Sequence, residues 1–201
     1  NIINTYNRKW GFPACVGAVD GTYIPMIAPT QNHADYVNRK GYHSVVKQAV
    51  VDCNYLFRDI VVGWPGSVHD ARVLSNSEIF RLWEQNKLFP DGYHVNAGGK
   101  YIAPVILGDP AYPLLPWLLR PYPENKDTVR KQRRFNYRLS RARVTVENAF
   151  GWWKGRFRRF LKRVDMQLKN LVTVIAASCI MHNICGWITR KSFYNGWKNQ
   201  T

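Results

Sequence analysis

Acidic residues are scarce in this sequence. Its 201 residues include 13 Asp and Glu against 29 Lys and Arg, which gives a formal net charge of +16. So large an excess of positive charge goes far beyond what solubility requires. It indicates a polyanionic partner, with nucleic acid as the first candidate and an anionic membrane surface as the alternative.

Cysteine is also rare and carries no metal signature. The four cysteines, Cys15, Cys53, Cys179 and Cys185, are too few to scaffold a chain of this length with disulfides, and their spacing matches no zinc motif. Cys179 and His182 can share one face of a helix, but Cys185 is rotated to the far side. We therefore expect a reducing compartment and no structural zinc site.

Internal repeats, low-complexity tracts and a secretory leader are all missing from the sequence. Because it begins at Asn1, we expect an N-terminal region, with any targeting segment, to be missing. A hydrophobic content of 46% is enough for one sizeable core, so residues 1–201 are predicted to form a single domain. The apolar run 171–188 resembles a membrane span, but it contains His182 and Asn183; we predict a buried helix and no membrane partner.

The scarcity of acids is most marked between Arg130 and Arg163. This segment holds thirteen Lys or Arg residues and a single carboxylate, Glu147. A lone acid in so basic a segment suggests a metal ligand held against a polyanion. The alternative is an i,i+4 ion pair between Arg143 and Glu147 on a solvated helix.

Helical spacing divides this basic segment into two faces. The first face is polar and includes a glycine that lets a backbone approach closely: Ser140, Arg143, Glu147, Gly151 and Lys154. The opposite face is apolar and is predicted to pack on a core: Val146, Phe150, Trp153 and Phe157.

Three β-rich runs precede any long helix: residues 14–24, 45–53 and 57–64. The first has Asp20 in its middle and is predicted as a central strand. Asn54 and Tyr55 separate the other two, which predicts an antiparallel hairpin. Ser67 or Asp70 is then expected to cap a helix whose apolar face is formed by Leu74, Ile79, Leu82 and Trp83.

The second half adds one strand and two long helices. Residues 101–107 are predicted as a buried strand that runs into Gly108 and Asp109, and residues 114–119 as a short helical turn. The basic helix is expected to begin between Thr128 and Asn136 and to end near Arg163, and residues 168–190 form the last helix. This order predicts an α/β fold with a mixed central sheet flanked by helices.

Three acids become candidates for one site. Asp20 lies within the first strand, Asp109 at the carboxyl end of the last strand, and Glu147 on the basic helix. Sites in open α/β sheets gather at the carboxyl ends of strands, so these carboxylates can converge. Oxygen ligands without a His or Cys cluster suit two Mg²⁺ or Mn²⁺ ions and phosphodiester chemistry. Asp70 is the rival for the second carboxylate, and Asp52 is the next.

Four ordered blocks resemble the nuclease domain of PIF/Harbinger transposases, which belong to the DDE superfamily, and of their domesticated relatives. They are Ala18-Val-Asp20-Gly-Thr, Gly66-Ser-Val-His-Asp70-Ala-Arg-Val-Leu, Leu107-Gly-Asp109-Pro-Ala-Tyr-Pro-Leu and Arg143-Val-Thr-Val-Glu147-Asn-Ala-Phe-Gly-Trp-Trp-Lys154. The resemblance implies an RNase H-like fold with Asp20, Asp109 and Glu147 as catalytic metal ligands. Ser140 stands where the wider pattern has Tyr.

The resemblance also implies a function and partners. It implies a nuclear transposase nuclease that cuts DNA at transposon ends and joins the 3′-hydroxyl to target DNA. The implied partners are a Myb/SANT-like DNA-binding protein and further copies of the same chain in a homo-oligomer. The residues expected to contact DNA are Arg143, Lys154, Arg156, Arg158, Arg159 and Lys162. The alternatives are a domesticated protein that binds DNA or a Myb-like partner without cutting, and a repair or RNA nuclease.

Overall fold

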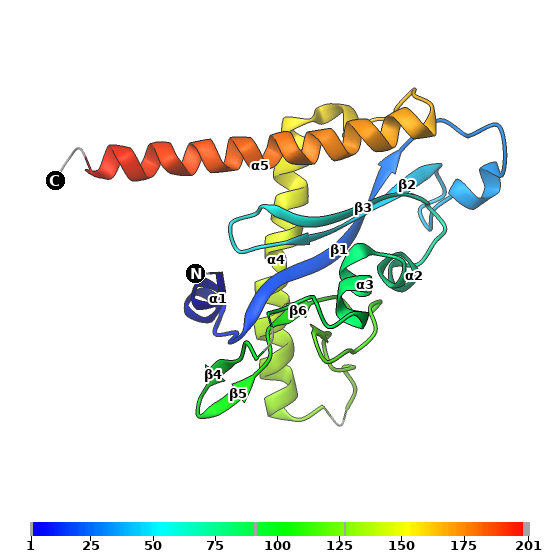
Figure 1. Ribbon diagram of the computed structural model, residues 1–201. Coiled ribbons are helices and arrows are strands. Elements are labelled where there is room, and N and C mark those ends of the chain that lie inside the picture. The colour runs from blue at the N-terminus through cyan, green and yellow to red at the C-terminus, as the bar shows by residue number, and fades with distance from the viewer. Residues whose placement is uncertain (1, 91, 127, 199–201) are drawn as a thin grey trace.

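A five-stranded mixed sheet forms the centre of the protein (Figure 1). The computed structural model describes residues 2–90, 92–126 and 128–198, and the side chains of these residues as far as 189. The strands lie in the order β3-β2-β1-β6-β7, where β1 is Cys15–Pro25, β2 Ser44–Val51, β3 Phe57–Pro65, β6 Val105–Leu107 and β7 Leu118–Leu119. The first three strands pair antiparallel, whereas β6 is parallel to β1 and β7 is parallel to β6. The predicted central strand and hairpin are confirmed.

Helices cover both faces of the sheet. The helices α1 (Ile2–Trp10), α4 (Arg130–Arg156) and α5 (Leu168–Lys198) pack on one face, and α2 (Asp70–Ser75) and α3 (Glu78–Glu84) pack on the other. Neighbours along a strand serve opposite faces: Ala18 belongs to the first core and Val19 to the second. Because both faces are covered, every residue of β2 is buried, including Lys47 and Gln48.

Several predicted elements differ from the structure. The single helix predicted after residue 67 is two short helices, and His69 rather than Ser67 or Asp70 occupies the N-cap of α2. The break between them is set by Ser77, whose hydroxyl caps α3 by accepting from the Phe80 N–H.

The predicted strand 101–107 is also divided. Its first part belongs to a separate two-stranded hairpin, β4 (Val95–Ala97) with β5 (Lys100–Ile102), and only β6 enters the central sheet. Pro104, which cannot donate to a ladder, lies at the break. The helical turn predicted at 114–119 is wrong, because Leu118 and Leu119 extend the sheet as β7.

The basic helix has the predicted core face. Val146, Phe150 and Trp153 are buried and Phe157 is partly buried. The helix ends at Arg156 rather than near Arg163, and a 3₁₀ helix, Arg158–Leu161, follows it. The change of direction buries Phe160, whose ring stacks on that of Trp153 with centroids 4.7 Å apart.

The prediction that the last helix is buried is wrong. Leu171, Ile175 and Cys179 pack on the core, but the opposite side of α5 exposes apolar residues: Val174, Ile180, Met181, Ile184, Trp187 and Ile188. Figure 1 shows α5 running past the sheet, so only one side of it meets the rest of the domain. By length and composition Leu168–Thr189 could cross a membrane, a test that core helices of soluble proteins also pass.

Candidate active site

Asp20 and Asp109 meet where β6 ends. In the parallel pair of β1 and β6, Ala18 is in register with Leu107, so two further residues along each chain bring Asp20 level with Asp109. β1 continues to Pro25, whereas β6 stops at Leu107. The shorter strand therefore leaves Asp20 at the carboxyl edge of the parallel part of the sheet, where ligand sites collect in α/β folds.

A third carboxylate approaches from α2. Gly21 has no side chain, and a Cβ atom there would collide with Asp70 Oδ1. This glycine lets the first residue of α2 lie directly against β1, next to Asp20. Asp70 was the sequence-based rival for second carboxylate, and the structure places it in the same cluster as Asp109.

The proximity of the three acids affects the pKa values of the cluster. Burial raises the pKa of Asp20 to about 6; Arg143 and the Gly21 N–H oppose the rise, and the charges of Asp109 and Asp70 add to it. Burial and the charge of Asp109 likewise raise the pKa of Asp70. These carboxylates therefore lack enough hydrogen-bond donors and positive charge to stabilise them fully as anions.

Arg143 lies between the strand acids and Glu147. Its Nη2 donates to Asp20 Oδ2 at 2.8 Å, and its Nη1 lies 3.5 Å from Glu147 Oε1. The Arg143 side chain is 13% exposed and that of Asp20 19%, whereas that of Glu147 is 54% exposed. The structure thus brings Glu147 to the same region as Asp20, but on the solvent side of an arginine that contacts both acids.

A buried tyrosine to which no sequence motif had pointed lies near the cluster. Tyr112 is fully buried, and its hydroxyl donates to Gln48 Oε1 at 3.1 Å. Burial raises the pKa of Tyr112 well above its usual value, and the charges of Asp70, Asp20 and Asp109 add to the effect. Its position three residues after Asp109 is visible in the sequence, but its direction depends on the loop that follows β6.

The predicted DNA-binding cations occupy different environments. Lys154 Nζ donates to Thr22 Oγ1 at 2.7 Å and to the Tyr23 carbonyl at 3.0 Å, so two of its three donors tie α4 to β1. Arg156 pairs with His182 Nδ1 at 2.8 Å, between α4 and α5. Arg158, Arg159 and Lys162 are exposed. Their contact with DNA stays a prediction.

Asp52 is not part of the acid cluster. Its Oδ1 accepts from the Asn54 and Leu56 N–H groups, and its Oδ2 accepts two hydrogen bonds from Arg58 at 2.6 and 2.8 Å. Its side chain is fully buried. These four donors satisfy the carboxylate, so Asp52 stabilises the turn between β2 and β3.

The donor set of the cluster has the chemistry of a Mg²⁺ or Mn²⁺ site. Asp20, Asp70 and Asp109 supply hard oxygen atoms, and their mutual repulsion is a penalty that a divalent cation would relieve. Among the described residues, no three His, Cys, Asp or Glu side chains already form a group that could hold a metal ion. The ring nitrogens of His182 face Arg156 and the Tyr55 carbonyl.

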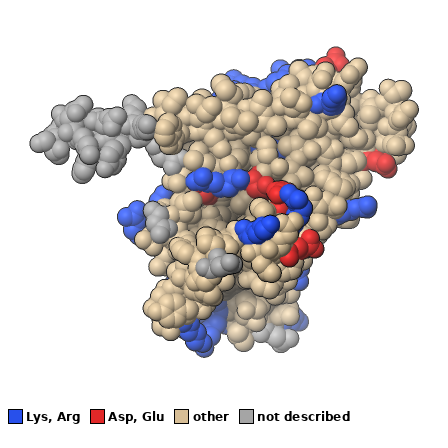
Figure 2. All heavy atoms as spheres, viewed as in Figure 1, with Lys and Arg blue, Asp and Glu red and all other residues tan. Residues whose placement is uncertain are grey.

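Figure 2 shows acidic atoms near the middle of one face with Lys and Arg atoms beside them. Carboxylates at a sheet edge next to a basic helix define a site suited to phosphate esters and metal ions. Residues 19–183 match the family model described as DDE superfamily endonuclease. The chain belongs to this family, and the resemblance to PIF/Harbinger nucleases is confirmed.

Named relatives agree with this assignment. The Arabidopsis thaliana protein named "Protein ALP1-like" is 37% identical over 186 residues, which cover 91% of this chain and 46% of that relative. The Arabidopsis thaliana protein named "Antagonist of like heterochromatin protein 1" is 31% identical over 192 residues, covering 92% and 48%. The human protein named "Putative nuclease HARBI1" is 28% identical over 179 residues, covering 87% and 46%.

The chain spans about half the length of these relatives. No solved structure matches it.

Proposed function

We propose that this chain is the catalytic core of a metal-dependent DNA endonuclease and strand transferase of the Harbinger type. The observation that carries the proposal is the meeting of Asp20, Asp70 and Asp109 beside the basic helix α4, with the pKa of Asp20 raised to about 6. Perturbed carboxylates that repel one another are typical of functional sites. The mixed sheet flanked by helices, with its acids at one edge, supports the RNase H-like fold that the resemblance implies.

Asp20, Asp109 and Glu147 are the proposed metal ligands, and Asp70, whose carboxylate lies against Gly21, is the candidate for a further oxygen ligand. Two Mg²⁺ or Mn²⁺ ions, when bound, activate the attacking oxygen and stabilise the leaving oxygen. Arg143, which contacts both Asp20 and Glu147, is placed to hold a phosphate of the substrate once the acids bind cations.

Two displacements make up the reaction. In the first, the oxygen of a water molecule attacks phosphorus, the P–O3′ bond breaks, and the DNA end is released as a 3′-hydroxyl while the water's remaining proton leaves to solvent. In the second, this 3′-hydroxyl loses its proton and attacks a phosphodiester of target DNA, whose own 3′ oxygen departs and takes up a proton to become a new 3′-hydroxyl. Both steps need the same acids and the same basic surface.

A second candidate is a domesticated protein that binds DNA without cutting it. The ion pair between Arg143 and Asp20 favours it, because the guanidinium group already occupies one oxygen of a proposed metal ligand. The relative named for antagonism of a heterochromatin protein carries a name that concerns chromatin rather than transposition. For either candidate we infer a nuclear location and a Myb/SANT-like partner, to be checked by imaging a tagged chain and by co-precipitation with such a partner.

A plasmid-nicking assay with Mn²⁺ tests the enzyme proposal. Wild-type protein and Asp165→Ala, which removes an exposed acid elsewhere, should nick supercoiled DNA, whereas Asp109→Ala should not, and all three should retain DNA on a filter. Nicking by Asp109→Ala at the wild-type rate would overturn the proposed ligand set. Retention of DNA by wild-type protein without any nicking would select the domesticated candidate.

A further inference from the structure

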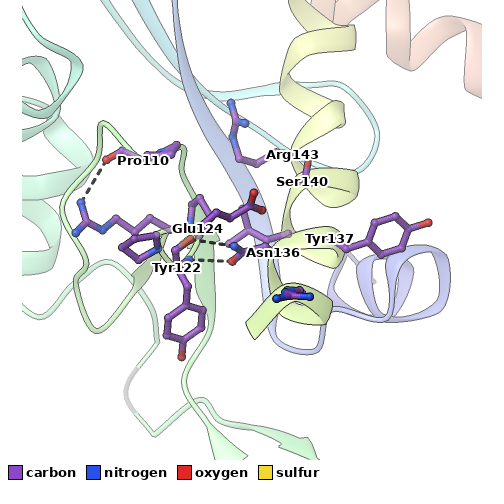
Figure 3. Close-up of a pocket in the computed structure, with 12 residues that line it drawn as sticks. Pro110, Tyr122, Glu124, Asn136, Tyr137, Ser140 and Arg143 are labelled. Atoms are coloured by element: carbon purple, nitrogen blue, oxygen red, sulfur yellow. Dashed lines mark hydrogen bonds between the residues drawn. The ribbon is translucent and has the colours of Figure 1, made fainter. Parts of the chain in front are cut away.

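A pocket of about 770 Å³ opens beside the acid cluster (Figure 3). One wall is formed by Pro110 and the segment from Arg120 to Glu124, and the other by the first half of α4. The lining residues are Pro110, Arg120, Pro121, Tyr122, Pro123, Glu124, Arg133, Asn136, Tyr137, Leu139, Ser140 and Arg143. Its volume lies in the range of pockets that take small organic groups.

The pocket is continuous with the proposed site of cleavage. Arg143 lines it and at the same time donates to Asp20. Pro110 lines it and directly follows Asp109. A DNA strand whose phosphate reached these aspartates would therefore have its neighbouring nucleotide at the mouth of this pocket.

Two sets of hydrogen bonds hold the loop wall in place. Asn136 is nearly fully buried, and its side-chain amide makes a reciprocal pair with the backbone of Tyr122, accepting from its N–H at 2.8 Å and donating to its carbonyl at 2.9 Å. Arg120 donates to the carbonyls of Pro110 and Tyr112 at 3.2 and 3.3 Å. The pocket therefore exists before any ligand enters it, which lowers the entropy cost of binding.

The charges inside the pocket are of both signs. Three arginines, Arg120, Arg133 and Arg143, line it together with one acid, Glu124. Among the described residues Glu124 makes no ion pair with any of them, and Figure 3 shows its carboxylate pointing into the space between the walls. An ionised carboxylate only accepts hydrogen bonds, so it repels phosphate and suits a neutral group with N–H donors.

We propose that this pocket holds one unpaired nucleotide next to the cut, with its phosphate toward Arg133 and Arg143 and its base toward Glu124. The exocyclic amino group of cytosine, or that of adenine, donates to the carboxylate, as N1–H and N2–H of guanine also can. Thymine has no amino group, and its single N3–H donor lies between two carbonyl oxygens that repel a carboxylate, so thymine binds more weakly. Tyr122 and the prolines provide apolar surface for the base. The inference rests on the proposed DNA substrate, and it makes Glu124 a specificity-determining residue.

The test measures binding alone, without metal, so that it is independent of cleavage. Fluorescence anisotropy would compare one duplex carrying a three-nucleotide 3′ overhang of dC, dA, dT or abasic sugar. We expect wild-type protein to bind the dC and dA overhangs about fivefold or more tightly than dT, the lower end of what one good base contact contributes. Glu124→Gln can also donate to thymine, so its preference should fall below about twofold.

Glu84→Gln is the matched control, because it removes the same charge from an exposed position outside the pocket. It should tighten binding to all four overhangs equally and keep the wild-type preference. Equal binding of all overhangs by wild-type protein, or the same preference in Glu124→Gln as in Glu84→Gln, overturns the inference. Nicking without base preference would leave the proposed function standing, and base preference without nicking would leave this inference standing.

Discussion

Asp20 lies within β1 and Asp52 directly follows the neighbouring strand β2; both side chains are largely or fully buried, yet their surroundings differ. Asp52 accepts four hydrogen bonds, two of them from the charged Arg58. Asp20 accepts from Gly21 and Arg143 and also faces the charges of Asp109 and Asp70, so its pKa is raised to about 6. A buried acid that is fully satisfied serves the fold, whereas one that is crowded by other acids is retained at a cost to stability and indicates function.

The largest effect should come from Asp20→Asn. This change preserves shape but removes a proposed ligand, and we expect Mn²⁺-dependent cleavage to fall by about 10³-fold or more, as the loss of several kcal/mol of transition-state stabilisation would give. DNA retention should persist because the basic surface is untouched. Single-turnover cleavage and filter binding measure the two quantities. Cleavage at the wild-type rate in this variant would show that Asp20 is not needed for function.

Asp52→Asn should affect stability instead. The amide has one acceptor oxygen instead of two, so it cannot accept from both the turn N–H groups and the charged Arg58. Loss of these hydrogen bonds should lower the free energy of unfolding by about 1–3 kcal/mol. Urea titration measures this change. Cleavage per folded molecule should stay within about twofold of wild type. Loss of cleavage in a folded Asp52→Asn protein would mean that the turn after β2 belongs to the site after all.

This comparison also shows what the sequence could and could not predict. Alternating and continuous apolar runs predicted β1 and the β2–β3 hairpin, and the position of Asp109 after a buried strand predicted where it lies. Asp70 looked like a helix cap because its local sequence is that of a helix start. Its approach to Asp20 depends on the missing side chain of Gly21, a contact between distant segments that no local pattern reports.

The same limit explains the other differences. The pocket wall depends on Asn136 pairing with the backbone of Tyr122, fourteen residues away. The strand β7 has two residues, too few to show the alternation of apolar and polar side chains that marks a strand. Its leucines are therefore equally compatible with a helical turn. In α5 the apolar residues extend around most of the helix, which predicted burial, but the described part of the chain packs on only one side of it.

Lys47 is a buried cation that, like Asp20, has few groups to stabilise its charge. It is fully buried in β2, and its Nζ lies 3.6 Å from the ring centroid of Phe57 and 4.0 Å from that of Trp153. Burial lowers the pKa of Lys47 from 10.5 to about 7, which the nearby Cys179 opposes. Between these two values the unfolded chain binds one more proton than the folded chain, so stability should rise with pH from about 7 to 10.

Lys47→Met tests this reading. The variant should be more stable than wild type at pH 6 by about 1–4 kcal/mol, because a buried charge is replaced by an apolar side chain of similar size. Its advantage should shrink as the pH is raised toward 10. Thermal melts across this range give the result. A less stable variant at pH 6 would show that the aromatic rings around Nζ stabilise the charged lysine more than burial penalises it.

The smallest change in stability should come from Glu147→Gln. This variant tests whether Glu147 is a functional acid, as proposed for Asp20, or a structural one like Asp52. The Glu147 side chain is 54% exposed and its contact with Arg143 is 3.5 Å long, so losing this i,i+4 pair should alter the free energy of unfolding by no more than about 0.5 kcal/mol. If Glu147 is a metal ligand, Mn²⁺ should raise the melting temperature of wild-type protein and of the control Glu84→Gln more than that of Glu147→Gln, since binding to the folded state alone stabilises it. Cleavage should then be lost in the same variant. A Glu147→Gln protein that keeps both the Mn²⁺ effect and cleavage would leave Glu147 as a surface partner of Arg143, and the metal would have to be held by Asp20, Asp70 and Asp109 alone.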